Sequence, residues 1–245
     1  MFWCTFEHLI VAGFSSHNTK MRRQKIPASE RAFIEHIREL EQKQFPDQLH
    51  DDRSMMKSEE RRFWHFRPSH HFATGLLTQE DVALLSRPNT HLLSVGAFPC
   101  FLERILLELG IPAHNIVIAD KDPAILQCSK QMKAVTFDAT DAWPEMGMFD
   151  RIIFPESLCT CLGDTMREKN LISDDVRKRD AVEAELLTGL MRQALYRLHP
   201  GGILRANGPM SHPNVVRMME ESLQKDGYRH SLGYQRFFLY IRKEL

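Results

Sequence analysis

The second part of the chain alternates between short apolar runs and longer segments with helical periodicity. The apolar runs from His91 onward are HLLSV, NIVIA, AVTF, FDRIIF and GGILRA. The predicted helices between them span about Phe101 to Leu109, Pro123 to Met132 and Asp175 to Leu198. Strands that alternate with helices build β-α-β units, whose strands lie parallel in one sheet. The sequence therefore predicts a doubly wound α/β fold with a mostly parallel sheet.

The carboxy-terminal end follows a different pattern. A helix is predicted from about Pro213 to Lys225, and the runs GYRHSLGY and QRFFLYIRK follow it. These two extended runs are close enough in sequence to pair antiparallel. We therefore expect a C-terminal antiparallel hairpin.

Residues 1–88 are predicted to be a tail and a mostly helical cap, ahead of a Rossmann-like domain at 89–245. One helix is expected from Ser29 to Gln44, because apolar residues recur there on one face. A second, MMKSEERRFWHF, should end before Pro68, since proline disfavours a helical predecessor. A third should begin at the capping-box sequence of Thr78 to Asp81 and run through Leu85.

Composition narrows the class of protein. The 245 residues contain 32 basic and 32 acidic side chains, so the overall charge does not favour a nucleic-acid partner, although it leaves one open. Five cysteines form no metal or disulfide pattern, which indicates a reducing, cytoplasmic setting. The apolar first fourteen residues include Glu7 and are too short to span a bilayer, so no membrane partner is expected.

The most informative segment is LLSVGAFPCFLERILLELG, in which a strand ends at Val95 and a helix starts directly after the turn at Gly96. Such a turn is expected to point backbone N–H groups at a ligand beyond the end of the strand. The next strand ends at Asp120, twenty-five residues after Val95. A carboxylate there is well placed to accept hydrogen bonds from both hydroxyls of a ribose.

Further acidic residues follow the next two strands. Asp138 follows the third strand, in a DATD sequence that equally suits local turn hydrogen bonds. Glu156 follows the fourth strand, where it is a candidate general base or amine-binding residue.

This order of turns, with LHPGGILRANG after a long helix and a closing antiparallel pair, resembles the class I S-adenosylmethionine-dependent methyltransferases. The resemblance implies a Rossmann-like methyltransferase sheet and S-adenosyl-L-methionine as cofactor. It places the methionine part on the turn, the ribose at the end of the second strand and the adenine after the third. The implied cofactor-binding residues are Gly96, Ala97, Phe98, Asp120, Lys121, Asp138, Ala139 and Pro155.

The turn departs from the family pattern. A typical family turn reads acidic-x-Gly-x-Gly-x-Gly, and this chain has Ser94, Gly96, Phe98 and Cys100 at those places. Two alternatives to a methyltransferase therefore stay open. One is a catalytically inactive, methyltransferase-like binding or regulatory module. The other is an aminocarboxypropyl transferase that uses the same cofactor, by similarity to nicotianamine synthase-like enzymes with a proline-containing turn.

The cap supplies candidate substrate residues in RRFWHFRPSHHF, namely Trp64, Arg67, His70 and His71. Arginines among aromatic rings can stack on planar groups and hold anions, or can form an ordinary amphipathic helix. The adjacent histidines point apart on regular structure, so no metal site is predicted. Cys159 and Cys161 are interpreted as structural. The leading hypothesis is methyl transfer to a small molecule or an exposed nucleophile, with Glu156 as the candidate catalytic residue.

Overall fold

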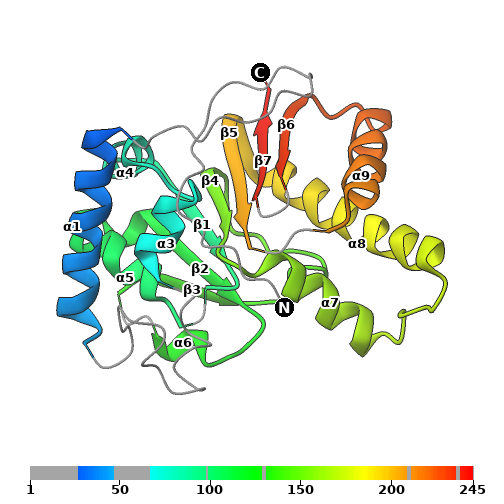
Figure 1. Ribbon diagram of the computed structural model, residues 1–245, viewed down its shortest axis with the longest axis horizontal. Coiled ribbons are helices and arrows are strands. Elements are labelled where there is room, and N and C mark those ends of the chain that lie inside the picture. Colours follow the sequence, from blue (N-terminus) through cyan, green and yellow to red (C-terminus); the bar gives the residue numbers. More distant parts are fainter. Residues whose placement is uncertain are drawn as a thin grey trace.

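The computed structural model describes residues 27–46, 67–97, 99–128, 131–208, 211–235 and 238–244. Its seven strands form one sheet in the order β3-β2-β1-β4-β5-β7-β6 (Figure 1). They are β1 (Leu92–Val95), β2 (Ile116–Asp120), β3 (Lys133–Thr136), β4 (Phe149–Phe154), β5 (Leu198–Asn207), β6 (His230–Gln235) and β7 (Phe238–Lys243). Strands β1 to β5 pair parallel, and β7 pairs antiparallel with β5 and β6. The predicted doubly wound sheet and closing hairpin are confirmed.

The strand order reverses between β1 and β4. From β1 the chain builds outward through β2 to β3, and it then crosses back to place β4 on the other side of β1. Ligands of open α/β sheets bind at such a switch point, in the crevice beyond the carboxyl ends of the strands. A ligand site is therefore expected at the turns that follow β1 and β4.

Helices cover both faces of this sheet (Figure 1). On one face lie α1 (Ala28–Gln44), α3 (Pro68–Ala73), α4 (Gln79–Leu85) and α5 (Phe101–Glu108), and on the other α7 (Leu158–Glu168), α8 (Val176–Arg197) and α9 (Pro213–Lys225). Short helices α6 (Ile125–Cys128) and η2 (Ala113–Asn115) complete the described elements. Neighbours on a strand point to opposite faces. Accordingly, Leu92 joins the core beneath α1 and α5, whereas Leu93 joins the core beneath α8.

The cap helices share an apolar core with the sheet. Ile37 of α1 and Phe72 of α3 lie in the same buried cluster as Ile105 of α5 and Ile118 of β2. The cap therefore packs directly on the Rossmann-like part, and the boundary at residue 88 stays a prediction. None of the helices in the described ranges is long and apolar enough to cross a membrane.

The structure confirms one helix prediction and corrects another. The capping box is confirmed, because Thr78 Oγ1 accepts from Asp81 N at 3.2 Å and Asp81 Oδ2 accepts from Thr78 N at 2.9 Å. The helix predicted from Pro123 to Met132 was too long, since among its described residues Ile125–Cys128 are helical and both predicted ends are not. Asp122 accepts a hydrogen bond from Ala124 N and favours a turn there. The predicted helix MMKSEERRFWHF lies outside the described residues.

Asp81 also fixes α4 to the sheet. Its carboxylate pairs with Arg151 of β4, with 2.5 Å between Nε and Oδ1, and with Arg205 of β5. The Asp81 side chain is 1% exposed, and those of Arg151 and Arg205 are 14% and 12% exposed. A buried carboxylate between two largely buried guanidinium groups is costly to break from one side.

Candidate functional site

The turns that follow β1 and β4 are in direct contact at the switch point. Gly96 has a φ of +71°, and a Cβ added to it would overlap Ser157 Cβ and lie 2.6 Å from Ser157 Oγ. Ser157 Oγ in turn donates a hydrogen bond to Val95 O at 2.6 Å. Gly96 is therefore required both by its backbone conformation and by the close approach of the second turn.

The backbone N–H groups of Gly96 and Ala97 in the first turn are hydrogen-bonded within the sheet. Gly96 N and Ala97 N donate to the same carbonyl oxygen, Ala119 O, at 2.7 and 3.2 Å. They extend the hydrogen bonding between β1 and β2 past the last paired residues, Val95 and Ala119. The expectation that the N–H groups of this turn face a ligand was therefore wrong for Gly96 and Ala97.

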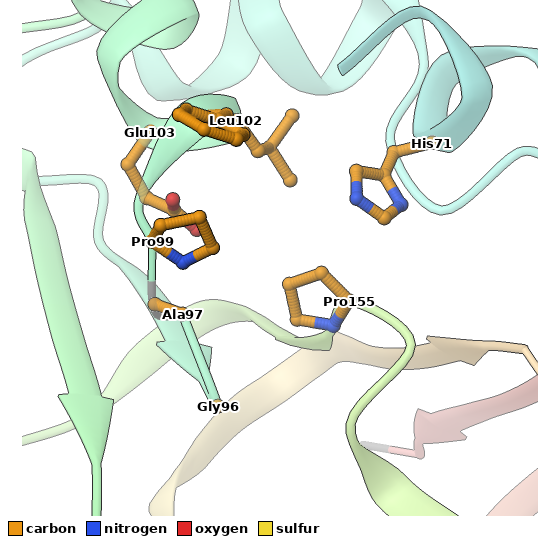
Figure 2. Close-up of a pocket in the computed structure, with 8 residues that line it drawn as sticks. His71, Gly96, Ala97, Pro99, Leu102, Glu103 and Pro155 are labelled. Carbon is orange, nitrogen blue, oxygen red and sulfur yellow. The ribbon is translucent and has the colours of Figure 1, made fainter. Parts of the chain in front are cut away.

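A small, partly open cavity lies beside the turn (Figure 2). Its volume is about 10 Å³, and it is lined by His71, Gly96, Ala97, Pro99, Phe101, Leu102, Glu103 and Pro155. These residues come from α3, from the turn after β1, from the start of α5 and from the turn after β4. The structure thus brings four predicted residues, Gly96, Ala97, Pro155 and His71, around one space.

Glu103 is the site residue that the sequence analysis missed. It is 1% exposed, and Ser94 Oγ donates a hydrogen bond to Glu103 Oε1 at 2.5 Å. Burial raises the pKa of the Glu103 carboxyl to about 7; the Ser94 hydrogen bond opposes this shift, and the charge of Asp120 adds to it. The sequence signal was a charged residue on the apolar face of FLERILLELG, beside Leu102 and Leu106.

The raised pKa makes a testable prediction for stability. The unfolded chain ionises Glu103 near pH 4.5 and the folded chain near pH 7, so this group makes the protein less stable as pH rises through that window. Each pKa unit corresponds to about 1.4 kcal/mol. Relative to wild type, Glu103→Gln should therefore gain about 2 to 3 kcal/mol between pH 5 and pH 8. Urea unfolding at both pH values measures this, and a constant difference between the two proteins would contradict it.

Asn207 connects the cap helix α3 to the carboxyl end of the sheet. Its Oδ1 accepts from Glu156 N at 3.0 Å, and its Nδ2 lies 3.0 Å from both His71 Nδ1 and Thr74 Oγ1. A peptide N–H can only donate, so the amide orientation is fixed and Nδ2 must donate to His71 Nδ1. His71 Nδ1 is therefore the acceptor of this hydrogen bond.

Glu156 sits in a strained turn directly after β4. Its φ is +56°, unusual for a residue with a side chain, and such strain gathers at functional sites. His70 Nε2 lies 3.2 Å from Glu156 Oε1, and the Glu156 side chain is 10% exposed. The structure thus brings the predicted catalytic residue into contact with the predicted substrate residue His70.

The predicted ribose and adenine residues have different surroundings. Asp120 is half-buried at the end of β2, and its Oδ1 accepts from Asp122 N at 2.9 Å. Lys121 Nζ pairs with Asp164 at 2.8 Å and Glu168 at 3.1 Å on α7, and the Asp164 hydrogen bond leads the causes that raise the Lys121 pKa. This ion-pair network ties Lys121 to α7.

The stretch after β3 makes mainly local hydrogen bonds. Asp138 Oδ1 accepts from Thr140 N at 2.8 Å and from Thr140 Oγ1 at 2.7 Å, which is the turn alternative left open by the sequence. Ala139 is buried, and its carbonyl accepts from Trp143 Nε1 at 2.8 Å. An adenine-binding role for Asp138 and Ala139 stays a prediction.

The remaining predicted residues lie away from the cavity or outside the described ranges. Arg67 is 4% exposed and does not line the cavity; its Nη2 is 2.8 Å from Glu41 Oε2 on α1. Glu41 also accepts from Ser69 N and Oγ, so this cluster holds the start of α3. The geometry favours a supporting role for Arg67. Trp64 and Phe98 lie outside the described residues.

The two cysteines of α7 are poor nucleophiles in this fold. Burial raises the pKa of Cys159 to about 11 and that of Cys161 to about 12, with nearby carboxylates adding to both shifts. Thiols with such pKa values stay protonated near neutral pH. Within the parts of the chain that the structure describes, no group of three or more His, Cys, Asp or Glu side chains is arranged to hold a metal ion.

Solved structures with a similar architecture include methyltransferases. The sugar N-methyltransferase KedS8 from Streptoalloteichus sp ATCC 53650 is 11% identical over 68% of this chain and 85% of its own, with a TM-score of 0.44. A methyltransferase from Pyrococcus furiosus is 13% identical over 89% of this chain and 100% of its own, with a TM-score of 0.47. The N-methyltransferase NodS from Bradyrhizobium japonicum WM9 is 13% identical over 68% of this chain and 94% of its own, with a TM-score of 0.40.

No protein-family model matches the sequence, and no curated protein matches it. The structural similarities concern architecture alone at these identities. Function is therefore inferred from the residues of the site.

Proposed function

We propose that the chain is an S-adenosylmethionine-dependent methyltransferase that acts on a small molecule or an exposed nucleophile. The observation that carries this proposal is the meeting of three strand ends at the switch point. The Gly96 turn follows β1, Asp120 ends β2, and Pro155 with Glu156 follows β4. A nucleoside cofactor can lie across these ends with its ribose toward β2.

The side chains present fit this cofactor. Asp120 offers a half-buried carboxylate for the ribose hydroxyls, and Ala97 and Pro155 form uncharged walls beside the turn after β1. When bound, the cofactor would supply a methyl group activated by a neighbouring sulfonium charge. The protein's task is then to align an acceptor with that group and to exclude water.

Glu156 and His70 are the residues we assign to the acceptor. A neutral nucleophile loses a proton when it is methylated, and the Glu156–His70 pair offers two titratable groups 3.2 Å apart to receive it. Asn207 holds the peptide N–H of Glu156, so the strained turn keeps the carboxyl at this position. This arrangement supports general-base assistance by Glu156.

Thermal unfolding tests the proposal. S-adenosylmethionine or S-adenosylhomocysteine at about 100 times its dissociation constant should stabilise the protein by about 2.7 kcal/mol, which raises Tm by roughly 5 to 10 °C. Asp120→Ala should abolish the shift, because it removes the ribose acceptor. Asp122→Ala, a change to the neighbouring exposed acid, should keep it. Absence of any shift in the wild-type protein would refute the proposal.

One observation favours a second candidate, a binding or regulatory module without catalysis. The N–H groups of Gly96 and Ala97 are used within the sheet, and Lys121 and Asp138 already have protein partners. Few polar groups at the switch point are therefore left to bind a cofactor. The same is expected of a chain that has lost cofactor binding. A well-folded protein that binds neither S-adenosylmethionine nor S-adenosylhomocysteine would favour this second candidate.

A further inference from the structure

The cavity between α3 and α5 is lined by an acidic side chain, Glu103, to which the proposed function assigns no role. Glu103 lines it from the first turn of α5, and Gly96 and Pro155 line it from the two turns of the switch point (Figure 2). The carboxyl is held by Ser94, which stands on β1 directly beneath the turn. A buried acidic group thus lies next to the place where the cofactor's non-nucleoside end should lie.

A nearby cation would stabilise the ionised form of the Glu103 carboxyl. This carboxyl accepts hydrogen bonds from the neutral Ser94 hydroxyl and from its own backbone N–H, and no Lys, Arg or His within the described ranges forms an ion pair with it. Burial raises its pKa to about 7 for the same reason. A buried carboxylate is costly unless a cation or several hydrogen bonds compensate it.

The facing wall does not supply that cation. His71 lies across the cavity from Glu103 (Figure 2), and its Nδ1 accepts a hydrogen bond from Asn207. Among the described residues, Glu103 thus has no basic ion-pair partner, and a cationic ligand group would supply one.

The size of the cavity limits the ligand group that enters it. A volume of about 10 Å³ is roughly one water-sized sphere. An ammonium group is close to water in size and offers three donors.

We propose that Glu103 is the counter-ion for the α-ammonium group at the amino-acid end of the cofactor. This inference rests on the proposed function. The Glu103 side chain, held by Ser94, would bind the amino-acid end of the cofactor. The backbone N–H groups of Gly96 and Ala97 do not provide this contact, because they bond to Ala119 O. The nucleoside end would be recognised separately, by Asp120.

Two ligands separate these parts of the cofactor. S-adenosylhomocysteine carries the amino-acid end, and 5′-methylthioadenosine carries the same nucleoside without it. Calorimetric titration of wild type and Glu103→Gln with both ligands at pH 8 tests the proposal. Glutamine keeps an acceptor for Ser94 and avoids the cost of a buried charge, so this variant should fold. Glu108→Gln, at the exposed other end of α5, is the matched control.

We expect Glu103→Gln to weaken S-adenosylhomocysteine binding by about 10- to 100-fold, as for loss of a hydrogen bond to a charged group. Binding of 5′-methylthioadenosine should stay within about twofold, and Glu108→Gln should match wild type for both ligands. Equal weakening of both ligands, or of neither, would overturn the role of Glu103 while leaving the proposed function intact. If wild type binds neither ligand, the proposed function itself fails.

Discussion

Asp81→Asn should cause the largest loss of stability among the single changes considered. The substitution keeps the size of the side chain but leaves Arg151 and Arg205 largely buried without their shared counter-charge. Breaking a buried ion pair from one side typically costs about 3 to 5 kcal/mol. Tm should therefore fall by about 10 °C in a chain of this size. Urea unfolding at pH 7 gives the free energy directly.

Asp164→Asn is the matched control. Asp164 also pairs with two cations, Lys121 and Arg167, but its side chain is 23% exposed and those of its partners 39% and 65%. Exposed ion pairs contribute about 1 kcal/mol or less. Equal losses for the two variants would contradict the assigned role of Asp81 in fixing α4 to β4 and β5.

The Asp81 effect should also depend on pH. Burial alone would raise the pKa of Asp81, but Arg205 and Arg151 outweigh burial and lower it. A carboxyl with a lowered folded pKa contributes stability that is present above its unfolded pKa of about 3.9 and is lost as pH falls through the folded value. The difference between wild type and Asp81→Asn should be largest near neutral pH and shrink below about pH 4.

Gly96→Ala should produce the second largest effect, on both stability and cofactor binding. The left-handed conformation at Gly96 costs a residue with a side chain about 1 to 2 kcal/mol. The overlap of the new Cβ with Ser157 adds about 1 to 3 kcal/mol, as overpacking typically does. The two turns would also be pushed apart, so S-adenosylhomocysteine binding should weaken with stability. Chemical unfolding and calorimetric titration of the same sample measure both.

Gly75→Ala separates the two causes. Gly75 has a φ of +78°, but an added Cβ there would meet nothing within 4 Å. This variant should show the backbone cost alone, about 1 to 2 kcal/mol, with ligand binding unchanged. A Gly96→Ala protein no less stable than Gly75→Ala would show that the close contact between the turns does not matter.

Local sequence patterns predicted most of the fold. Apolar runs of strand length marked β1 to β5, and Thr78 with Asp81 formed the predicted capping box, because both signals depend on neighbours in the chain. The helix predicted from Pro123 to Met132 failed for an equally local reason. Asp120 and Asp122 both accept hydrogen bonds from following N–H groups, and the resulting turn delays the start of the helix to Ile125.

The site was predictable only as far as topology fixes it. The order of strands placed Gly96, Asp120 and Glu156 at the carboxyl ends of parallel strands, and the structure has them there. The contacts that define their chemistry join residues far apart in the chain. Asn207 reaches His71 over 136 positions, and Arg67 reaches Glu41 from a different helix. No local pattern indicates such partners, so the sequence could not show that Arg67 pairs with Glu41. Glu103 did have a local signal, its charge on the apolar face of α5, which the sequence analysis did not use.

Calorimetric titration of the wild-type chain with S-adenosylhomocysteine tests the proposed cofactor site most directly. We predict saturable binding of one ligand per chain, and the loss of that binding in Asp120→Ala at unchanged stability. No heat of binding at millimolar ligand, from a protein that unfolds cooperatively and is therefore intact, would contradict the proposed function.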